Sequence, residues 1–307
     1  MPSVSPINWT GNKSCIFETI SAFIPPHRVY IEPCMGSAEV FFRKDPVEKE
    51  YINDFNGDLV NFFRVLQSNK NLVKLLGRLC LSFNSEEMFR QRKDLLAGVP
   101  NILDDVLETA EMIREFTDEE IELAAAFYEN QVFSFSSMGE SFAIAKKDMT
   151  KRFPRLIAAC SRLRDAIIMH RDYKDVIAYA ACPGAFILLD PPYKGTEKMY
   201  QKSSFDGDEH ARLFAFMNDV HLKFCGECRF LITYNNDEYI RSLAGQYGLD
   251  MFVQERLHNM AQGTDPGKQF EELLIANYDL MTQAAENHHS LVMAKNQLTM
   301  YDYICDN

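Results

Sequence analysis

The motif Asp190-Pro191-Pro192-Tyr193 places a carboxylate, two prolines and an aromatic ring directly after an apolar run of strand length, residues 185–189. Ligands of open α/β sheets bind at the carboxyl ends of such strands. Because proline donates no N–H and has a restricted φ, the carbonyl oxygen of Pro191 is an acceptor with a fixed direction. Asp190 and this carbonyl could accept the two hydrogens of an exocyclic amine, while Tyr193 stacks on the ring that carries it. The motif could also be a simple turn capped by Asp190, but its place after the strand favours the amine site.

Three further segments could bind a nucleoside-like cofactor. Residues 32–38 place an acid and a glycine after a short apolar run, and glycine lets a backbone approach a ligand closely. Asp54 follows Gly36 by 18 residues, a spacing suited to an acid that accepts hydrogen bonds from ribose hydroxyls, and Phe55 beside it could pack on adenine. Residues 9–13 place the only tryptophan four residues before a lysine that could reach a carboxylate of the cofactor. Taken alone, each segment is also consistent with an ordinary turn or loop.

Together these segments resemble the Dam family of DNA adenine-N6 methyltransferases, from residue 7 to about residue 278. The matching motifs are residues 9–13 (W-x-G-G-K in the family), 32–38 (E-P-F-x-G-x-G), 54–56 (D-x-N), 190–193 (D-P-P-Y) and 272–275 (E-L-L). Their order, with the cofactor loop first and D-P-P-Y last, is that of the family's alpha group. At Asn12, Cys34 and Ala38 the chain departs from the family's glycine, phenylalanine and glycine, so we expect weaker cofactor binding rather than its loss.

The resemblance implies S-adenosylmethionine as methyl donor, S-adenosylhomocysteine as its product and adenine in double-stranded DNA as acceptor. It implies a Rossmann-like α/β sheet with an inserted, mainly helical target-recognition subdomain. Because a base inside a duplex cannot present its amine, the adenine must be flipped out, and no metal is required for the transfer. By position, the catalytic residues are Asp190, Pro191, Pro192 and Tyr193. The cofactor-binding residues are Trp9, Lys13, Glu32, Pro33, Gly36, Ser37, Asp54, Phe55 and Asp190.

Charge divides the middle of the chain. Residues 101–129 contain ten acidic residues and one basic residue, whereas residues 146–174 contain nine basic and three acidic residues. These runs could be two solvated helix faces, or the basic run could face a phosphate backbone while the acidic run faces away from it. Residues 127–139 also resemble the family's DNA-contacting segment. The predicted DNA-binding residues are Asn130, Ser134, Ser136 and Ser137, which would read bases; Lys146, Lys147, Lys151, Arg152 and Arg155, which would neutralise phosphates; and Lys194 and Tyr200, in a loop that would close over the flipped base.

The apolar pattern predicts the elements that position these residues. Short runs at residues 29–31, 50–52, 185–189, 229–234 and 273–278 predict strands of one sheet, and the last three are typical of parallel strands buried on both faces. A helical turn near residues 38–43 lies between the first two runs, as in a βαβ unit. We expect a discontinuous catalytic domain (1–61 and 174–280), an inserted helical target-recognition domain (62–173) and a C-terminal helix or tail (281–307).

Composition limits the classes of protein that the chain could be. Its 307 residues are 47 % hydrophobic and 25 % charged, as in ordinary globular proteins. The net charge of −12 argues against nonspecific coating of nucleic acid but allows a local basic groove. No apolar run is long enough to span a bilayer and no secretory signal is evident, so we expect a cytoplasmic protein. The Cys225–Cys228 CxxC lacks a second ligand pair, which favours a structural turn over a zinc site.

Two alternatives of different kinds stay open. The same fold could methylate cytosine N4 or an RNA adenine, although D-P-P-Y rather than S-P-P-Y favours adenine in the family. The chain could instead be a noncatalytic regulator that binds cofactor and DNA, but its intact tetrad favours catalysis. The recognition sequence, with GATC the family's commonest target, a cognate restriction endonuclease acting on the same site and the oligomeric state are also open.

Overall fold

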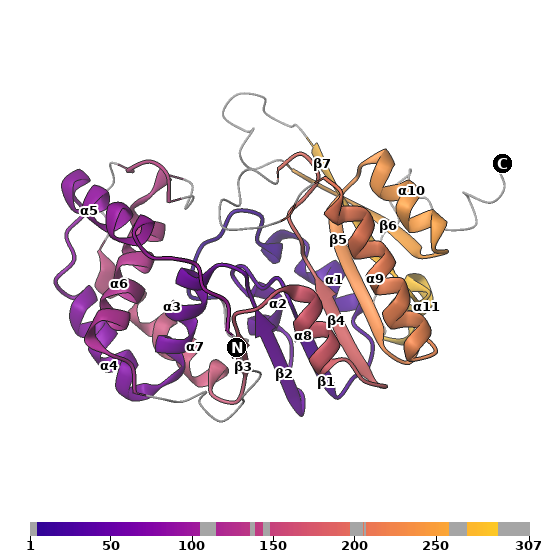
Figure 1. Cartoon of the computed structure of the whole chain (residues 1–307), viewed down its shortest axis with the longest axis horizontal. Coiled ribbons are helices and arrows are strands. Elements are labelled where there is room, and N and C mark those ends of the chain that lie inside the picture. The colour runs from indigo at the N-terminus through magenta and orange to yellow at the C-terminus, as the bar shows by residue number, and fades with distance from the viewer. Residues whose placement is uncertain are drawn as a thin grey trace. The chain divides into compact units, whose positions relative to one another are not determined.

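The computed structural model describes residues 5–104, 115–135, 139–143, 148–196, 205, 207–257 and 269–287. The chain forms two compact units, one of residues 1–13 and 34–176 and the other of residues 14–33 and 177–307. Figure 1 follows them along the chain from indigo to yellow. Within the described ranges, no helix combines the length and the apolar character needed to cross a membrane. The predicted domain boundaries, residues 61–62 and 173–174, stay a prediction.

The first unit is mainly helical. It contains strands β2 (Lys49–Asn53) and β3 (Ile167–Met169) and helices α2 (Glu39–Arg43), α3 (Gly57–Gln67), α4 (Asn69–Leu79), α5 (Glu86–Ala97), α6 (Asp118–Phe133), η4 (Met149–Arg152) and α7 (Phe153–Leu163).

The second unit carries most of the strands. It contains β1 (Val29–Glu32), β4 (Ala185–Leu189), β5 (Arg229–Asn235), β6 (Asp250–Leu257) and β7 (Gln269–Ala276), with helices α1 (Phe17–Phe23), α9 (Glu209–Lys223), α10 (Glu238–Gln246) and α11 (Leu280–Glu286). Two further helices, η1 (Lys13–Cys15) and α8 (Tyr173–Ala180), cross the boundary between the units.

The strands form one seven-stranded sheet in the order β3-β2-β1-β4-β5-β7-β6. The pairs β2–β3, β1–β4 and β4–β5 are parallel, whereas β7 is antiparallel to both β5 and β6. This confirms the predicted Rossmann-like α/β fold. The expectation that residues 273–278 form a parallel strand is wrong, because Leu273 to Ala276 lie buried in an antiparallel strand. An apolar run indicates that a strand is buried on both faces but does not indicate the direction of that strand.

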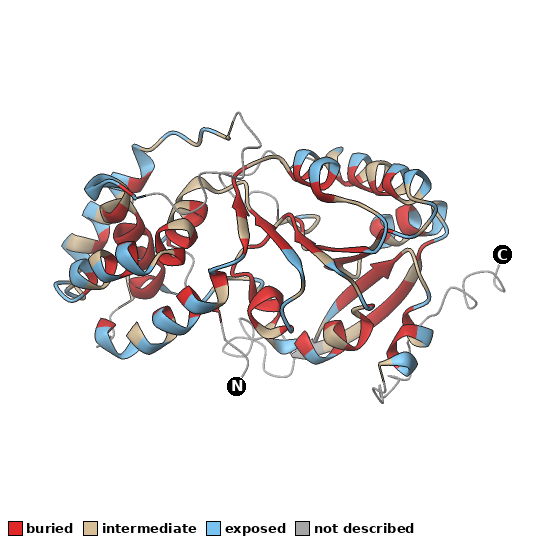
Figure 2. Ribbon diagram, turned by 90° about the horizontal axis from the view of Figure 1, so that it is seen from below, coloured by how far each residue is buried: buried red, intermediate tan, exposed pale blue. Residues whose placement is uncertain are grey.

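Helix capping accounts for several helix starts in the first unit. The side chain of Asn56 accepts hydrogen bonds from the N–H groups at the start of α3. Thr117 and Glu120 form a reciprocal capping box at the start of α6. The aromatic rings of Phe62 on α3 and Tyr128 on α6 then stack with centroids 5.2 Å apart. Figure 2 colours the buried residues of the helices red. In α6, every residue from Ala124 to Phe133 is buried.

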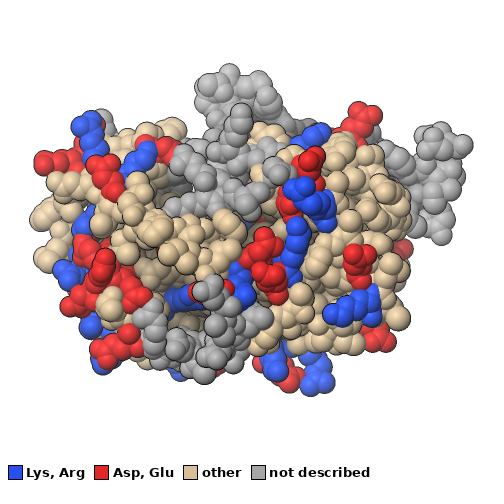
Figure 3. All heavy atoms as spheres, viewed as in Figure 1, with Lys and Arg blue, Asp and Glu red and all other residues tan. Residues whose placement is uncertain are grey.

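Several acidic residues of the run 101–129 form ion pairs with basic residues of neighbouring helices. Lys70 and Lys74 of α4 form ion pairs with Glu115, and Arg92 of α5 bridges Glu122 and Glu129 of α6. Acidic and basic side chains are accordingly interspersed over the face that Figure 3 shows. The described part of this run therefore serves helix packing.

A buried ionic cluster joins β2 to α7. The carboxylate of Glu50 accepts from Arg162 over 2.5 and 2.8 Å and from Lys44 over 2.6 Å, and the Arg162 guanidinium lies over the Phe41 ring. Burial alone would raise the pKa of Glu50, but the hydrogen bonds and charges of Arg162 and Lys44 outweigh it and hold this pKa below its ordinary value of 4.5. The ionised carboxylate therefore stabilises the folded state.

We expect Glu50→Gln to lower the free energy of unfolding by about 3 kcal/mol at neutral pH, because it leaves two buried cations without their anion. Because the folded pKa of Glu50 is lowered, its contribution is full above about pH 4.5 and is lost as pH falls through the folded pKa. Urea unfolding across pH checks this. Glu86→Gln, in the exposed pair with Arg90, should cost less than about 0.5 kcal/mol; equal losses in both variants would contradict the prediction.

Candidate functional site

The carboxylate of Asp54 ties the glycine-containing loop (residues 34–38) to the end of β2. Its Oδ2 accepts from the N–H of Gly36 and its Oδ1 from the N–H of Asn56, each over 2.9 Å. The N–H of Met35 also donates to the carbonyl of Asn53 over 2.8 Å. The two predicted cofactor segments that contain Gly36 and Asp54 are thus joined by direct hydrogen bonds.

Gly36 is required by both conformation and space. Its φ is +46°, in the left-handed region that favours glycine, and a Cβ there would lie 3.0 Å from two atoms of the Trp9 ring. The indole ring of Trp9 also lies beside the phenyl ring of Phe127, with the ring centroids 6.3 Å apart. Lys13 is buried, and its Nζ donates to the carbonyl of Gly11 over 2.8 Å. The first unit therefore brings Trp9, Gly36 and Asp54 together, and their role in cofactor binding stays a prediction.

The departure at Ala38 has a structural cost. Ala38 has φ +53° and ψ +35°, the left-handed conformation that glycine adopts without penalty. It lies fully buried at the N-cap of α2. Alanine is therefore strained where the family pattern has glycine.

The second unit contains the predicted catalytic tetrad, residues 190–193. The hydroxyl of Thr233 on β5 donates to Oδ1 of Asp190 over 2.7 Å. The hydroxyl of Tyr193 donates to the carboxylate of Glu272, a buried residue of β7. Burial of this hydroxyl raises the pKa of Tyr193 well above its ordinary value, and the negative charges of Asp190 and Glu272 act in the same direction. Tyr193 is half-buried and stays a neutral donor at physiological pH.

Glu32 of β1 is a buried acid in the same unit. Its Oε2 accepts from the hydroxyl of Tyr30 over 2.8 Å. Pro33, which follows it, is also buried. The pair Tyr30–Glu32 fixes the carboxylate at the carboxyl end of β1, one strand from the tetrad-bearing β4.

The predicted DNA-binding residues differ in their surroundings. Asn130 and Ser134 are buried at the end of α6, where Asn130 Nδ2 donates to the carbonyl of Gly139 and the Ser134 hydroxyl donates to that of Gln131. The predicted residues Ser136, Ser137, Lys146, Lys147 and Tyr200 lie outside the described residues.

Among the predicted basic residues, Lys151 is exposed and Arg152 is half-buried. Arg155 is half-buried, and burial lowers its pKa from the ordinary value despite the charge of Glu39. Lys194 forms an ion pair of 3.0 Å with Asp237, the N-cap of α10. Among the described members of the predicted phosphate-binding set, Lys151 is thus the most accessible.

Thr233, Asn101 and His170 were not predicted, and Glu272 was identified only as part of the E-L-L motif, with no role assigned to it. Asn101 and His170 contact the backbone beside Asp54 and are described below. The sequence signal for Glu272 is its place in that motif on β7, and the other three residues carry no signal.

Among the described residues, no group of three or more His, Cys, Asp or Glu side chains is arranged to hold a metal ion. The CxxC segment is a tight turn between α9 and β5, with Cys225 at φ +50° and Gly226 at φ +77°. Burial raises the pKa of Cys228 to about 12, so its thiol is protonated.

Comparison with known proteins agrees with this geometry. Residues 9–259 match the sequence model of the D12 class N6 adenine-specific DNA methyltransferases. The DNA N-6-adenine-methyltransferase of Escherichia phage P1 is 27 % identical over 247 residues, 76 % of this chain and 30 % of that protein. The type II methyltransferase M1.LlaDCHI of Lactococcus lactis subsp. cremoris is 24 % identical over 219 residues, 71 % of this chain and 74 % of that protein. A DNA adenine methylase of Vibrio cholerae is 34 % identical over 62 residues, 20 % of this chain and 22 % of that protein. The chain thus spans less than a third of the length of the phage P1 relative.

We expect Ala38→Gly to keep or raise the free energy of unfolding, because relief of the left-handed strain, about 1–2 kcal/mol, offsets the lost methyl burial and the added backbone freedom. Ala158→Gly, at an exposed position of α7, should lower it by about 1 kcal/mol. Urea denaturation of both variants checks the prediction, and equal destabilisation would show that Ala38 is not strained.

Proposed function

Because the chain belongs to the D12 class N6 adenine-specific DNA methyltransferase family, we propose that it transfers a methyl group from S-adenosylmethionine to N6 of an adenine in DNA. The observation that carries this proposal is the supported tetrad, in which Thr233 orients Asp190 and Glu272 orients Tyr193. Such support at the end of β4 gives a carboxylate and a ring fixed directions before any ligand binds.

The tetrad would act on the adenine amine by orientation. With Oδ1 of Asp190 held by Thr233, the carboxylate accepts one amine hydrogen and the carbonyl of Pro191 accepts the other. These contacts favour a pyramidal nitrogen whose lone pair is no longer conjugated with the ring. Pro192 restricts the backbone conformation between Pro191 and Tyr193. Tyr193 stacks on the flipped base, which recovers roughly 1–3 kcal/mol of the unstacking energy. Positioning of this kind supplies much of the rate of a transfer reaction.

The residues Trp9, Lys13, Glu32, Pro33, Gly36, Ser37, Asp54, Phe55 and Asp190 would bind S-adenosylmethionine. Their chemistry fits it: Asp54 and Glu32 are acceptors for ribose hydroxyls, and the buried Lys13 ammonium complements a carboxylate. The absence of a Cβ at Gly36 lets the Trp9 ring lie against the loop backbone. When bound, S-adenosylmethionine supplies a methyl group already activated by its sulfonium.

The end of α6 would recognise the target bases. The buried amide oxygens of Asn130 and Gln131 have no hydrogen-bond partner among the described residues. Buried polar groups are costly when unpaired, so a pair of open acceptors supports a ligand role here. The basic residues that follow α6 in the sequence would neutralise DNA phosphates. They are Lys146, Lys147, Lys151, Arg152 and Arg155. Lys194 and Tyr200 would close over the flipped base.

A restriction-modification role is the second part of the proposal. The Lactococcus relative is named as a type II methyltransferase, which supports a cognate endonuclease that cuts the same site. Cytosine N4 and RNA adenine remain the competing acceptors for the same tetrad chemistry.

We expect the protein to convert adenine in unmethylated genomic DNA to N6-methyladenine, detected by labelled methyl transfer and nucleoside mass spectrometry. Asp190→Ala should abolish transfer, and Thr233→Val should lower kcat by about ten-fold or more, since it keeps the side-chain shape but frees the carboxylate. Asp219→Ala, outside the site on α9, should retain activity. N4-methylcytosine as the product, or near-wild-type turnover by Asp190→Ala, would contradict the proposal.

Charge reversal tests the phosphate-binding role. Lys151→Glu/Arg152→Glu should weaken DNA binding and make the slope of log K against log salt shallower by about two, since each phosphate contact contributes about 0.9. Lys49→Glu/Lys223→Glu changes the net charge equally at exposed positions outside the predicted set. The same salt slope in wild type and in the first variant would refute the role.

A further inference from the structure

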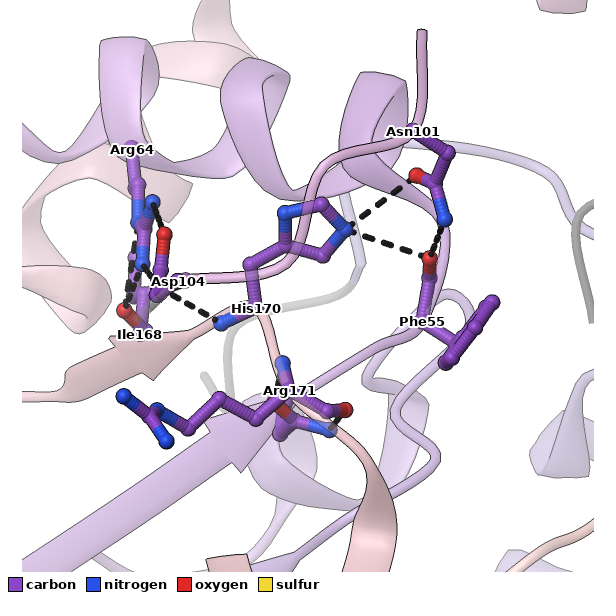
Figure 4. Close-up of polar contacts among 8 residues, drawn as sticks. Phe55, Arg64, Asn101, Asp104, Ile168, His170 and Arg171 are labelled. Atoms are coloured by element: carbon purple, nitrogen blue, oxygen red, sulfur yellow. Dashed lines mark hydrogen bonds and ion pairs between the residues drawn. The ribbon is translucent and has the colours of Figure 1, made fainter. Parts of the chain in front are cut away.

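A cluster of polar side chains holds the backbone beside Asp54 (Figure 4). Asn101 lies in the segment after α5. Its Nδ2 donates to the carbonyl of Phe55 over 2.8 Å, and its Oδ1 accepts from the N–H of Gly57 over 2.8 Å. One amide side chain therefore satisfies both a carbonyl and an N–H of the segment that joins Asp54 to α3.

His170, in the segment after β3, completes this bridge. Its Nε2 lies 3.2 Å from the carbonyl oxygen of Phe55 and 3.2 Å from Oδ1 of Asn101. Both atoms are acceptors, because a carbonyl carries no proton and this Oδ1 already accepts from Gly57. Nε2 must therefore carry the proton and donate to both. The imidazole is buried, so this tautomer is shielded from water.

The space at Gly57 shows how closely the cluster fits. A Cβ there would lie 2.9 Å from Oδ1 of Asn101 and 2.9 Å from Cε1 of His170. Such distances are not compatible with any side chain unless Asn101 or His170 moves. A glycine is needed here because of this close approach.

A second set of contacts holds His170 itself. Asp104 exchanges two backbone-directed hydrogen bonds with His170: its carboxylate accepts from the N–H over 3.2 Å, and its own N–H donates to the carbonyl over 3.0 Å. Arg64 of α3 forms an ion pair of 2.6 Å with Asp104 and donates to the carbonyl of Ile168. Burial alone would raise the pKa of Asp104, but Arg64 holds it below its ordinary value.

We propose that Asn101 and His170 are positioning residues for cofactor binding. They fix the peptide groups after Asp54, and Asp54 in turn holds the N–H of Gly36. The inference rests on the proposed function, which assigns Asp54, Phe55 and Gly36 to the cofactor. It gives Asn101, in the stretch predicted to recognise DNA, a part in binding the methyl donor.

Binding of S-adenosylhomocysteine to the full-length protein tests this, by calorimetry and by the fluorescence of Trp9, the only tryptophan. Asn101→Ala and His170→Phe should each raise Kd by about ten-fold through the lost hydrogen bonds. In the double variant, Kd should rise by less than the product of the two single-variant factors, because both side chains hydrogen-bond to the Phe55 carbonyl. With DNA present, KM for S-adenosylmethionine should rise in parallel while kcat changes by less than about two-fold.

Asn61→Ala is the matched control, since it removes an amide that donates to the Glu120 carbonyl over 2.8 Å between α3 and α6. It should lower Tm without changing Kd. If Asn101→Ala does not fold, Asn101→Asp keeps the acceptor for Gly57 and puts a carboxylate oxygen in place of the donor to Phe55, so its Kd should still rise.

The possible outcomes separate this inference from the proposed function. Wild-type affinity in Asn101→Asp and His170→Phe, or an equal loss of affinity in Asn61→Ala, would overturn the positioning role alone. A wild-type protein that does not bind S-adenosylhomocysteine would instead contradict the proposed function.

Discussion

The bond between the Asp54 carboxylate and the N–H of Gly36 is the constraint on which the first unit's part of the site depends. A loop with left-handed residues at Gly36 and Ala38 lies outside the regular helices and strands, so the N–H of Gly36 needs a hydrogen-bond partner from elsewhere. The carboxylate at the end of β2 supplies one, and the Trp9 ring can then pack against the bare backbone of Gly36. The orientation of one acid thus determines the shape of the loop, and the cost at Ala38 is tolerated because the loop is held from this side.

The tetrad is supported in a different way, by side chains from neighbouring strands. Thr233 comes from β5, which is parallel to β4, and Glu272 comes from β7, which is antiparallel to β5. The register pairs Glu272 with Asn235, the last residue of β5. A reversed strand therefore brings a residue from its first half to the edge where the parallel strands end. The antiparallel direction of β7, which the sequence pattern did not indicate, is what places this acid beside Tyr193.

Sequence reasoning succeeded where the signal is local. Strands β4 and β5 are short apolar runs, and the loop and tetrad are contiguous motifs, so both fold class and motif positions could be predicted. The contacts that support them are not local: Asp190 and Thr233 are 43 residues apart, and Phe55 and His170 are 115 apart. Strand β3 has only three residues, too few for a period to appear. The burial of Asn130 also could not be predicted, because a polar run indicates a surface unless its partners are known.

If residues 62–173 recognise the target as proposed, the position of the Asn101 bridge limits how the chain could acquire a new target sequence. Residues 62–173 form one continuous predicted insertion that could be exchanged as a whole. They include Asn101 and His170, whose side chains hydrogen-bond to the carbonyl of Phe55 beside Asp54. Grafting a whole foreign stretch would discard those contacts along with the old specificity. A chimaera should keep residues 101–104 and 168–171 of the recipient and replace only helices between them.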